Sequence, residues 1–112
     1  MKCLHIITPV KDSIDSTLET VKAIMESDIL VPFTYTVYND FSTEENTHRL
    51  EEAARQWNFR LVNLSDLTDH PSPNYLLVLQ TAQKEAIEAD AGLLIVESDV
   101  IVKKNTLQSL YN

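Results

Sequence analysis

The sequence predicts an α/β fold in which a mainly parallel sheet is covered by helices on both faces. Four short apolar runs are continuous rather than alternating, as expected for strands buried on both faces. Three amphipathic segments separate these runs, so strands and helices alternate along the chain. The 112 residues correspond to one domain, and the 44% hydrophobic content is enough to form a core.

The predicted strands are rich in aliphatic, β-branched and aromatic residues. They comprise residues 3–8, 33–38, 59–64 and 93–96. Proline lacks the backbone N–H that a sheet requires, so Pro9 should end the first strand. The polar stretches that follow the strands are therefore predicted to be loops.

The predicted helices carry apolar residues at helical spacing. These are Ile14, Leu18, Val21, Ile24 and Met25 in the first helix, and Leu50, Ala53, Ala54 and Trp57 in the second. Ser16 and Glu19 could form a capping box for the first helix, or this helix could begin a few residues earlier. Ser42 or Thr43 could cap the second helix. A third helix is predicted for about residues 75–89, with Gly92 available just beyond its end.

The composition excludes several classes of site. Gly92 is the only glycine, whereas a P-loop needs two and a dinucleotide fingerprint needs three. Cys3 is the only cysteine, so an internal disulfide and a cysteine-cluster metal site are both excluded. The net charge of −8 argues against nucleic-acid partners. No stretch approaches the roughly 20 apolar residues of a membrane span. A cytoplasmic location is the default expectation, with peripheral membrane attachment of a longer protein as the alternative.

Four segments lie where the predicted strands end, which is where parallel α/β sheets bind ligands. They are residues 8–13, 39–43, 65–74 and 97–99. Glu97 and Asp99 are the sharpest signal, because two carboxylates one residue apart can converge on Mg²⁺ or Mn²⁺. The alternative is an ordinary polar turn, which such a short pattern alone would favour.

Other polar residues near the strand ends are more ambiguous. Asp40 could accept a hydrogen bond from a base N–H or a ribose hydroxyl, although Asn39 and Asp40 also favour Asx turns. Asp12 could serve a ligand or the amino terminus of the next helix. His5 lies inside a predicted strand and fits a core histidine with a satisfied ring better than a ligand.

Three segments together resemble family-2 glycosyltransferases. The family's opening strand, Pro-x-x-Asn/Asp motif and helix are matched by IITPVKDSIDSTLETVKAIMES. Its next strand and Asp-Asp-x-Ser-type loop are matched by VYNDFSTEENTHRLEEAA, and its Asp-x-Asp region by ADAGLLIVESDVIVKKNTLQSL. The matches follow the family's order and spacing and cover nearly the whole chain.

The resemblance implies a GT-A fold, a Rossmann-like three-layer sandwich that binds a nucleoside diphosphate-sugar of the UDP or GDP type. It assigns nucleotide-binding positions to Thr8, Pro9, Val10, Asp12, Asn39, Asp40 and Glu97. The same resemblance makes Asp99 a ligand of Mn²⁺ or Mg²⁺, with Glu97 binding a metal-bound water or a ribose hydroxyl. The sequence departs from the family at Asn39, which replaces an aspartate. It also departs around the third helix, where the family has Gly, Arg or Asn and this chain has Gln80, Gln83 and Lys84.

The family continues well beyond the Asp-x-Asp strand, whereas 13 residues follow Asp99 here, including a predicted helix start at residues 105–111. We therefore expect residues 1–112 to be the truncated nucleotide-diphospho-sugar-binding portion of a GT-A domain, with the acceptor-binding half and the general base absent. This chain alone should then be inactive. The incompletely covered sheet should also favour self-association.

The leading functional hypothesis is the donor-binding part of an inverting, metal-dependent glycosyltransferase. The full-length enzyme would move a sugar to an acceptor hydroxyl on a glycan or a lipid-linked sugar. One alternative is a sugar-nucleotidyltransferase-like domain, but its triphosphate loop should be rich in glycine and basic residues, whereas TPVKDSIDS has one lysine and no glycine. Another is a non-catalytic α/β interaction or phospho-acceptor domain, but no lysine directly follows the strand at residues 93–96.

Overall fold

Four parallel strands form one sheet in the order β3-β2-β1-β4. We describe residues 3–27 and 31–97 of a computed structural model. The strands are β1 (Cys3–Val10), β2 (Phe33–Asn39), β3 (Arg60–Asn63) and β4 (Ala91–Ile95). The predicted α/β class with a parallel sheet is confirmed.

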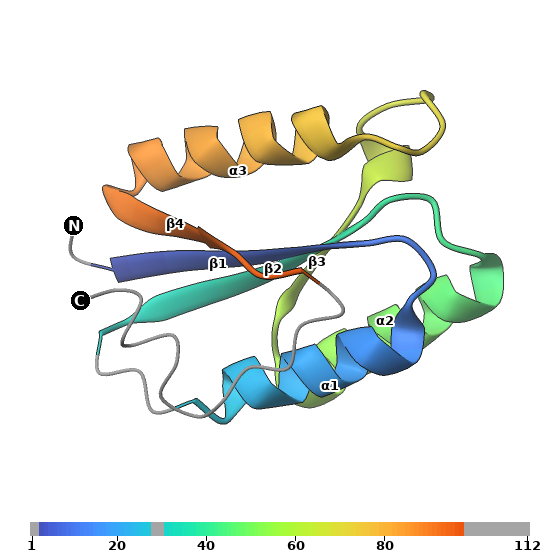
Figure 1. The fold of residues 1–112 in the computed structure, drawn as a ribbon, viewed down its shortest axis with the longest axis horizontal. Coiled ribbons are helices and arrows are strands. Elements are labelled where there is room, and N and C mark those ends of the chain that lie inside the picture. The colour runs from blue at the N-terminus through green and yellow to red at the C-terminus, as the bar shows by residue number, and fades with distance from the viewer. Residues whose placement is uncertain (1–2, 28–30, 98–112) are drawn as a thin grey trace.

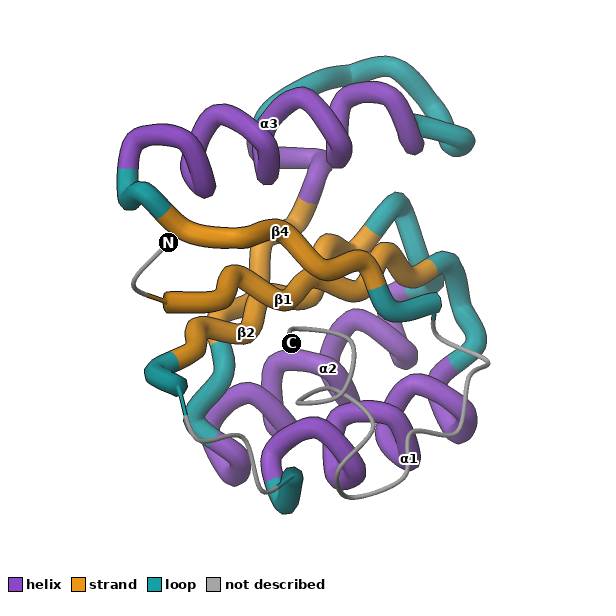
Figure 2. Tube along the Cα trace, turned by 60° about the vertical axis from the view of Figure 1, so that its left-hand side comes forward, coloured by secondary structure: helices purple, strands orange, loops and turns teal. Residues whose placement is uncertain are grey.

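The helices lie on both faces of this sheet, which gives a Rossmann-like three-layer sandwich. Helices α1 (Ile14–Met25) and α2 (Glu44–Trp57) cover one face, and α3 (Tyr75–Glu88) covers the other (Figures 1 and 2). A short 3-10 helix, η1 (Leu64–Asp66), follows β3. No helix within the described residues is long and apolar enough to cross a membrane.

Each face of the sheet has its own hydrophobic core, because successive strand residues point to opposite faces. Ile6 and Val37 belong to the core beneath α1 and α2, whereas Ile7 and Tyr38 belong to the core beneath α3. All four side chains are fully buried. The continuous apolar runs of the sequence are thus explained by burial on both faces.

β1 is longer than predicted, because Pro9 lies inside it and is paired with Tyr38 of β2. The missing N–H of Pro9 is tolerated because the ladder between β1 and β4 has already ended. Ile7 is the last β1 residue in register with β4, and its carbonyl accepts a hydrogen bond from Val96 N at 2.9 Å. The prediction that Pro9 ends the strand was wrong. β1 continues to Val10, whose carbonyl accepts from Asp40 N at 2.7 Å.

The helix ends agree only partly with the sequence signals. Thr43 caps α2 by accepting a hydrogen bond from Asn46 N at 3.3 Å, as predicted. α1 begins at Ile14, which is the earlier start that the sequence also allowed. Ser16 therefore lies inside the helix, and the capping box of Ser16 with Glu19 was wrong.

The chain leaves α3 through Asp90, which has a left-handed φ of 52°. Gly92, the glycine expected just beyond the helix, lies within β4 instead. Both Asp99 and the predicted fourth helix at residues 105–111 lie outside the described residues.

Candidate nucleotide-sugar site

A pocket of about 190 Å³ lies at the carboxyl edge of the sheet. Pro9 and Val10 line it from the end of β1, Asp40 from beyond β2, and Glu97 from beyond β4. The structure therefore brings together four of the predicted site residues from three separate strand ends.

The strand order explains why a pocket forms at this point. β1, β2 and β3 follow one another across the sheet through α1 and α2, and the chain then crosses back over α3 to place β4 on the other side of β1. The connections on either side of β1 therefore lead in opposite directions. Open α/β sheets bind ligands in the crevice outside such a switch in topology.

Asp40 organises the wall of this pocket. Its side chain is buried, and its carboxylate accepts hydrogen bonds from Asn74 N at 2.8 Å, Asn74 Nδ2 at 2.9 Å and Ser72 Oγ at 3.1 Å. Asn74 Nδ2 also donates to the His70 carbonyl at 2.9 Å. Asp40 thereby ties the loop before α3 to the end of β2. A carboxylate can accept about four hydrogen bonds, so Oδ1, which accepts one here, keeps capacity for a ligand donor.

Asp12 joins two loops at the same edge of the sheet. Its carboxylate accepts hydrogen bonds from Thr43 N at 2.7 Å and Asn46 Nδ2 at 3.1 Å, and its backbone N donates to Ser42 Oγ at 2.8 Å. The hydrogen bond from the Thr43 backbone is the largest cause of a lowered pKa for Asp12. The Asp12 carboxylate therefore fastens the loop after β1 to the start of α2.

Asn39 and Thr8 are buried, and other side chains occupy their polar groups. Asn39 Nδ2 donates to Thr47 Oγ1 and to Asn63 Oδ1, both at 2.9 Å. Thr8 Oγ1 accepts from the Tyr35 hydroxyl at 2.8 Å. Neither is among the described residues that line the pocket. The hydrogen bonds of Thr8 and Asn39 therefore stabilise the interior of the sheet near its carboxyl edge.

The pocket combines two acidic side chains with one basic side chain. Asp40 and Glu97 supply carboxylates, and Lys11 supplies an ammonium group. Lys11 donates a hydrogen bond to the Phe41 carbonyl, and its Nζ lies 3.9 Å from an Asp12 carboxylate oxygen. The surroundings of the pocket are thus more acidic than basic, so a polyanionic ligand needs a further positive charge there.

Within residues 3–27 and 31–97, no three His, Cys, Asp or Glu side chains form a metal-binding group. Glu97 is exposed at the pocket, whereas Asp99 lies beyond the described part of the chain. One or two carboxylates suffice for Mg²⁺ or Mn²⁺ when waters and phosphate oxygens complete the coordination. The donor chemistry of Glu97 fits such an ion.

Comparisons with known proteins show which solved structures share this fold. No protein-family model and no curated protein matches the sequence. Solved structures do match, among them S. aureus TarS 1-349 at a TM-score of 0.65 and 22% identity, covering 99% of this chain and 31% of that one. The same TarS fragment in complex with UDP-GlcNAc matches with a TM-score of 0.65, 24% identity and coverages of 99% and 30%. The mannosyltransferase PcManGT from Pyrobaculum calidifontis, in complex with GDP-Man and Mn²⁺, matches with a TM-score of 0.61, 19% identity and coverages of 96% and 30%.

The chain has the fold of part of a GT-A glycosyltransferase. It spans about a third of the length of the TarS fragment. The family resemblance noted in the sequence is thus supported by the GT-A architecture.

Several residues that line the pocket were not predicted from the sequence. They are Lys11, Ser72, Pro73, Tyr75 and Val78. The loop of residues 65–74 was expected at this edge, but no residue was selected within it. The available signal was the SPN sequence at residues 72–74, whose polar groups could partner a buried carboxylate. Gln80, Gln83 and Lys84, which depart from the family pattern, line a separate hollow beside Ile87 on α3.

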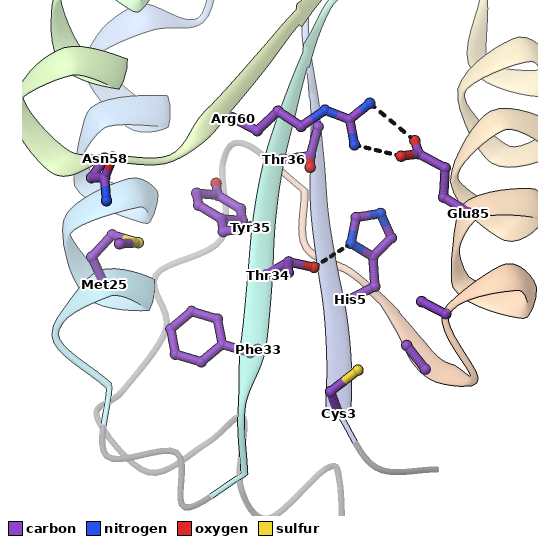
Figure 3. A pocket seen from close by; sticks show the side chains of 12 residues that line it. Cys3, His5, Met25, Phe33, Thr34, Tyr35, Thr36, Asn58, Arg60 and Glu85 are labelled. Carbon is purple, nitrogen blue, oxygen red and sulfur yellow. Dashed lines mark hydrogen bonds and ion pairs between the residues drawn. The ribbon is translucent and has the colours of Figure 1, made fainter.

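A larger cavity of about 480 Å³ lies at the opposite, amino edge of the GT-A sheet (Figure 3). β3 begins opposite Thr36, so the preceding part of β2 has no β3 neighbour there. His5 Nδ1 lies 2.7 Å from Thr34 Oγ1, whereas Nε2 has no hydrogen-bond partner in the described structure. The expectation of a fully satisfied His5 ring was therefore wrong. Burial lowers the pKa of His5.

An ion pair between Arg60 and Glu85 lies at the rim of this cavity (Figure 3). Glu85 also accepts a hydrogen bond from the Tyr38 hydroxyl at 3.1 Å. The hydrogen bond from Arg60 lowers the pKa of Glu85, while burial is the main cause that raises the pKa of Tyr38 to about 12. These contacts fix the carboxyl half of α3 against β2 and β3.

Proposed function

We propose that the pocket binds the nucleoside diphosphate part of a nucleotide-sugar. The observation that carries the proposal is the convergence of Pro9, Val10, Asp40 and Glu97 at the topological switch beside β1. The GT-A fold supports it, as do the ligands of similar structures, which contain UDP-GlcNAc or GDP-Man. In this proposal Asp40 accepts a hydrogen bond from the base or the ribose, and Pro9 and Val10 contact the nucleoside.

We place Thr8, Asn39 and Asp12 behind this surface. Thr8 and Asn39 are buried and directly precede the pocket-lining residues Pro9 and Asp40 in the sequence, and Asp12 holds the adjacent loops together. Their effect on nucleotide binding would therefore be indirect, through the shape of the carboxyl edge.

The charge of the pocket supports metal-dependent binding of a diphosphate. Glu97 and Asp99 would hold Mg²⁺ or Mn²⁺, with Asp99 as a direct ligand and Glu97 on a metal-bound water or a ribose hydroxyl. When bound, the ion would stabilise negative charge on the leaving diphosphate. Among the described residues that line the pocket, Lys11 is the one cationic side chain, and Asp40 and Glu97 supply two carboxylates. A diphosphate would be repelled by this arrangement without the ion.

The activity of the whole protein is proposed to be inverting transfer of the sugar to a hydroxyl of a glycan or a lipid-linked sugar. Such a transfer needs a general base within hydrogen-bond reach of the acceptor hydroxyl and a surface that orients the acceptor. Both are proposed to lie outside residues 1–112. These residues alone should therefore bind a donor without catalysing acceptor-dependent release of the diphosphate.

Calorimetric titration of the chain with UDP, GDP and ADP, each with and without Mn²⁺, tests the proposal. We expect binding of UDP or GDP to strengthen when Mn²⁺ is present. Glu97→Gln should weaken the Mn²⁺-dependent part, whereas Asp69→Asn, at an exposed position in the loop before α3, is the matched control. If no nucleotide binds in either condition, the proposed function is wrong.

A further inference from the structure

We propose that Tyr75 is the stacking surface for the base of the nucleotide. This inference rests on the proposed function of the pocket and assigns a specific residue to base binding. Tyr75 is the first residue of α3 and lines the pocket together with Pro9 and Val10 of β1. An aromatic ring from one side of the sheet and an apolar strand end thus contribute to the same small space.

The Tyr75 ring is not part of the hydrophobic packing of either core. Its residue surface is 44% exposed, and Tyr75 is not among the described residues that form or pack against either hydrophobic core. Large exposed aromatic rings beside a pocket commonly take part in ligand binding. A tyrosine ring can bury its flat apolar face against the ligand while its hydroxyl remains hydrated. The Tyr75 ring is therefore available to a ligand.

The backbone holds this ring in place before any ligand arrives. The preceding residue, Asn74, is fixed to Asp40 through both its backbone N and its side-chain Nδ2. The Asn74 carbonyl accepts a hydrogen bond from Val78 N at 3.1 Å in the first turn of α3. The carboxylate that would bind the base or ribose therefore also sets the position of Tyr75.

Stacking on Tyr75 should increase the affinity for the nucleotide without making the site specific for one base. Every nucleobase has a π face, so stacking tolerates different bases, whereas hydrogen bonds to groups such as Asp40 distinguish them. Tyr75→Ala should thus weaken UDP and GDP by similar factors. The expected loss is about 5- to 150-fold, which is the range for stacking of one base on an aromatic side chain.

The experiment compares Tyr75→Ala, Tyr75→Phe and Leu76→Ala by calorimetry with UDP, GDP, uridine and inorganic pyrophosphate in the presence of Mn²⁺. Leu76 is 67% exposed on the same helical turn and does not line the pocket in the described structure, so it is the matched control. We expect Tyr75→Ala to weaken UDP and uridine but not pyrophosphate, while Tyr75→Phe and Leu76→Ala bind like the parent. Circular dichroism confirms that each variant is folded.

Two results would overturn the inference while leaving the proposed function intact. The first is a Tyr75→Ala variant that binds UDP as tightly as the parent. The second is an equal loss of UDP and pyrophosphate binding, which would mean that the substitution acts on the pocket as a whole. Absence of UDP and GDP binding by the parent protein would instead refute the proposed function, and the inference with it.

Discussion

Replacing Asp40 with alanine should destabilise the protein, because Asp40 accepts three hydrogen bonds at a buried position. A hydrogen bond to a charged group contributes about 1.5–3 kcal/mol, and part of this is offset by the cost of burying the carboxylate. Ser72 is only half-buried and can bond to water after the substitution, whereas Asn74 is buried and loses two partners. We therefore expect a loss of about 3 kcal/mol in the free energy of unfolding.

Urea denaturation followed by the fluorescence of Trp57 measures this loss. With an m-value of about 1.5 kcal/mol/M, the Asp40→Ala midpoint should fall by about 2 M. Asp40→Asn keeps one acceptor oxygen and should lose about half as much. Asp69→Ala changes an exposed acid in the same loop and should leave the midpoint unchanged. Equal midpoints for Asp40→Ala and Asp69→Ala would refute the view that Asp40 anchors this loop.

Three further predictions concern other parts of the protein. Because burial lowers the pKa of His5 below its ordinary 6.5 in the folded state, the unfolded chain takes up the proton first as pH falls. The free energy of unfolding measured in urea should therefore drop from pH 7 to pH 5, and it should drop less steeply in His5→Gln. Glu85→Gln should lower the free energy of unfolding by about 1 kcal/mol in the same assay. The substitution weakens the ion pair with the half-exposed Arg60 and the hydrogen bond from Tyr38. An unchanged urea midpoint would contradict the stabilising role of these contacts. Asp99→Asn should remove the Mn²⁺-dependent part of UDP binding in calorimetry without changing the circular dichroism spectrum, and binding equal to that of the parent would refute the metal assignment.

The fold could be predicted because its signals are local. Continuous apolar runs separated by helical periodicity specify strands buried on both faces, and Thr43 is an ordinary helix cap. The errors arose where pairing elsewhere in the chain decides the outcome. Pro9 remains in β1 because the ladder with β4 ends at Ile7, which depends on strand order and not on the residues around the proline.

The sequence was enough to predict that the candidate site lies at the strand ends. It was not enough to predict which contacts each polar residue makes there. Asp12, Asn39 and Asp40 are all polar residues that follow or end a strand, so the sequence gives each the same weight. In the structure Asp12 binds Thr43 and Asn46, Asn39 is buried, and Asp40 lines the pocket. These differences depend on which loops meet at the carboxyl edge. Asp12, one of the acids that the alternative of a phospho-acceptor cluster would use, accepts hydrogen bonds from Thr43 and Asn46 in the structure.

The location of nucleotide binding is tested most directly by NMR titration of the ¹⁵N-labelled chain with UDP or GDP in the presence of Mg²⁺. We expect amide shift changes at the carboxyl edge, including Val10, Asp40 and Tyr75, with little change at His5 and Arg60 on the amino edge. Saturation of these shifts should give the same affinity as calorimetry performed with Mg²⁺. Shift changes confined to the amino-edge cavity, or none at saturating nucleotide, would contradict the central claim that the switch beside β1 forms the nucleotide site.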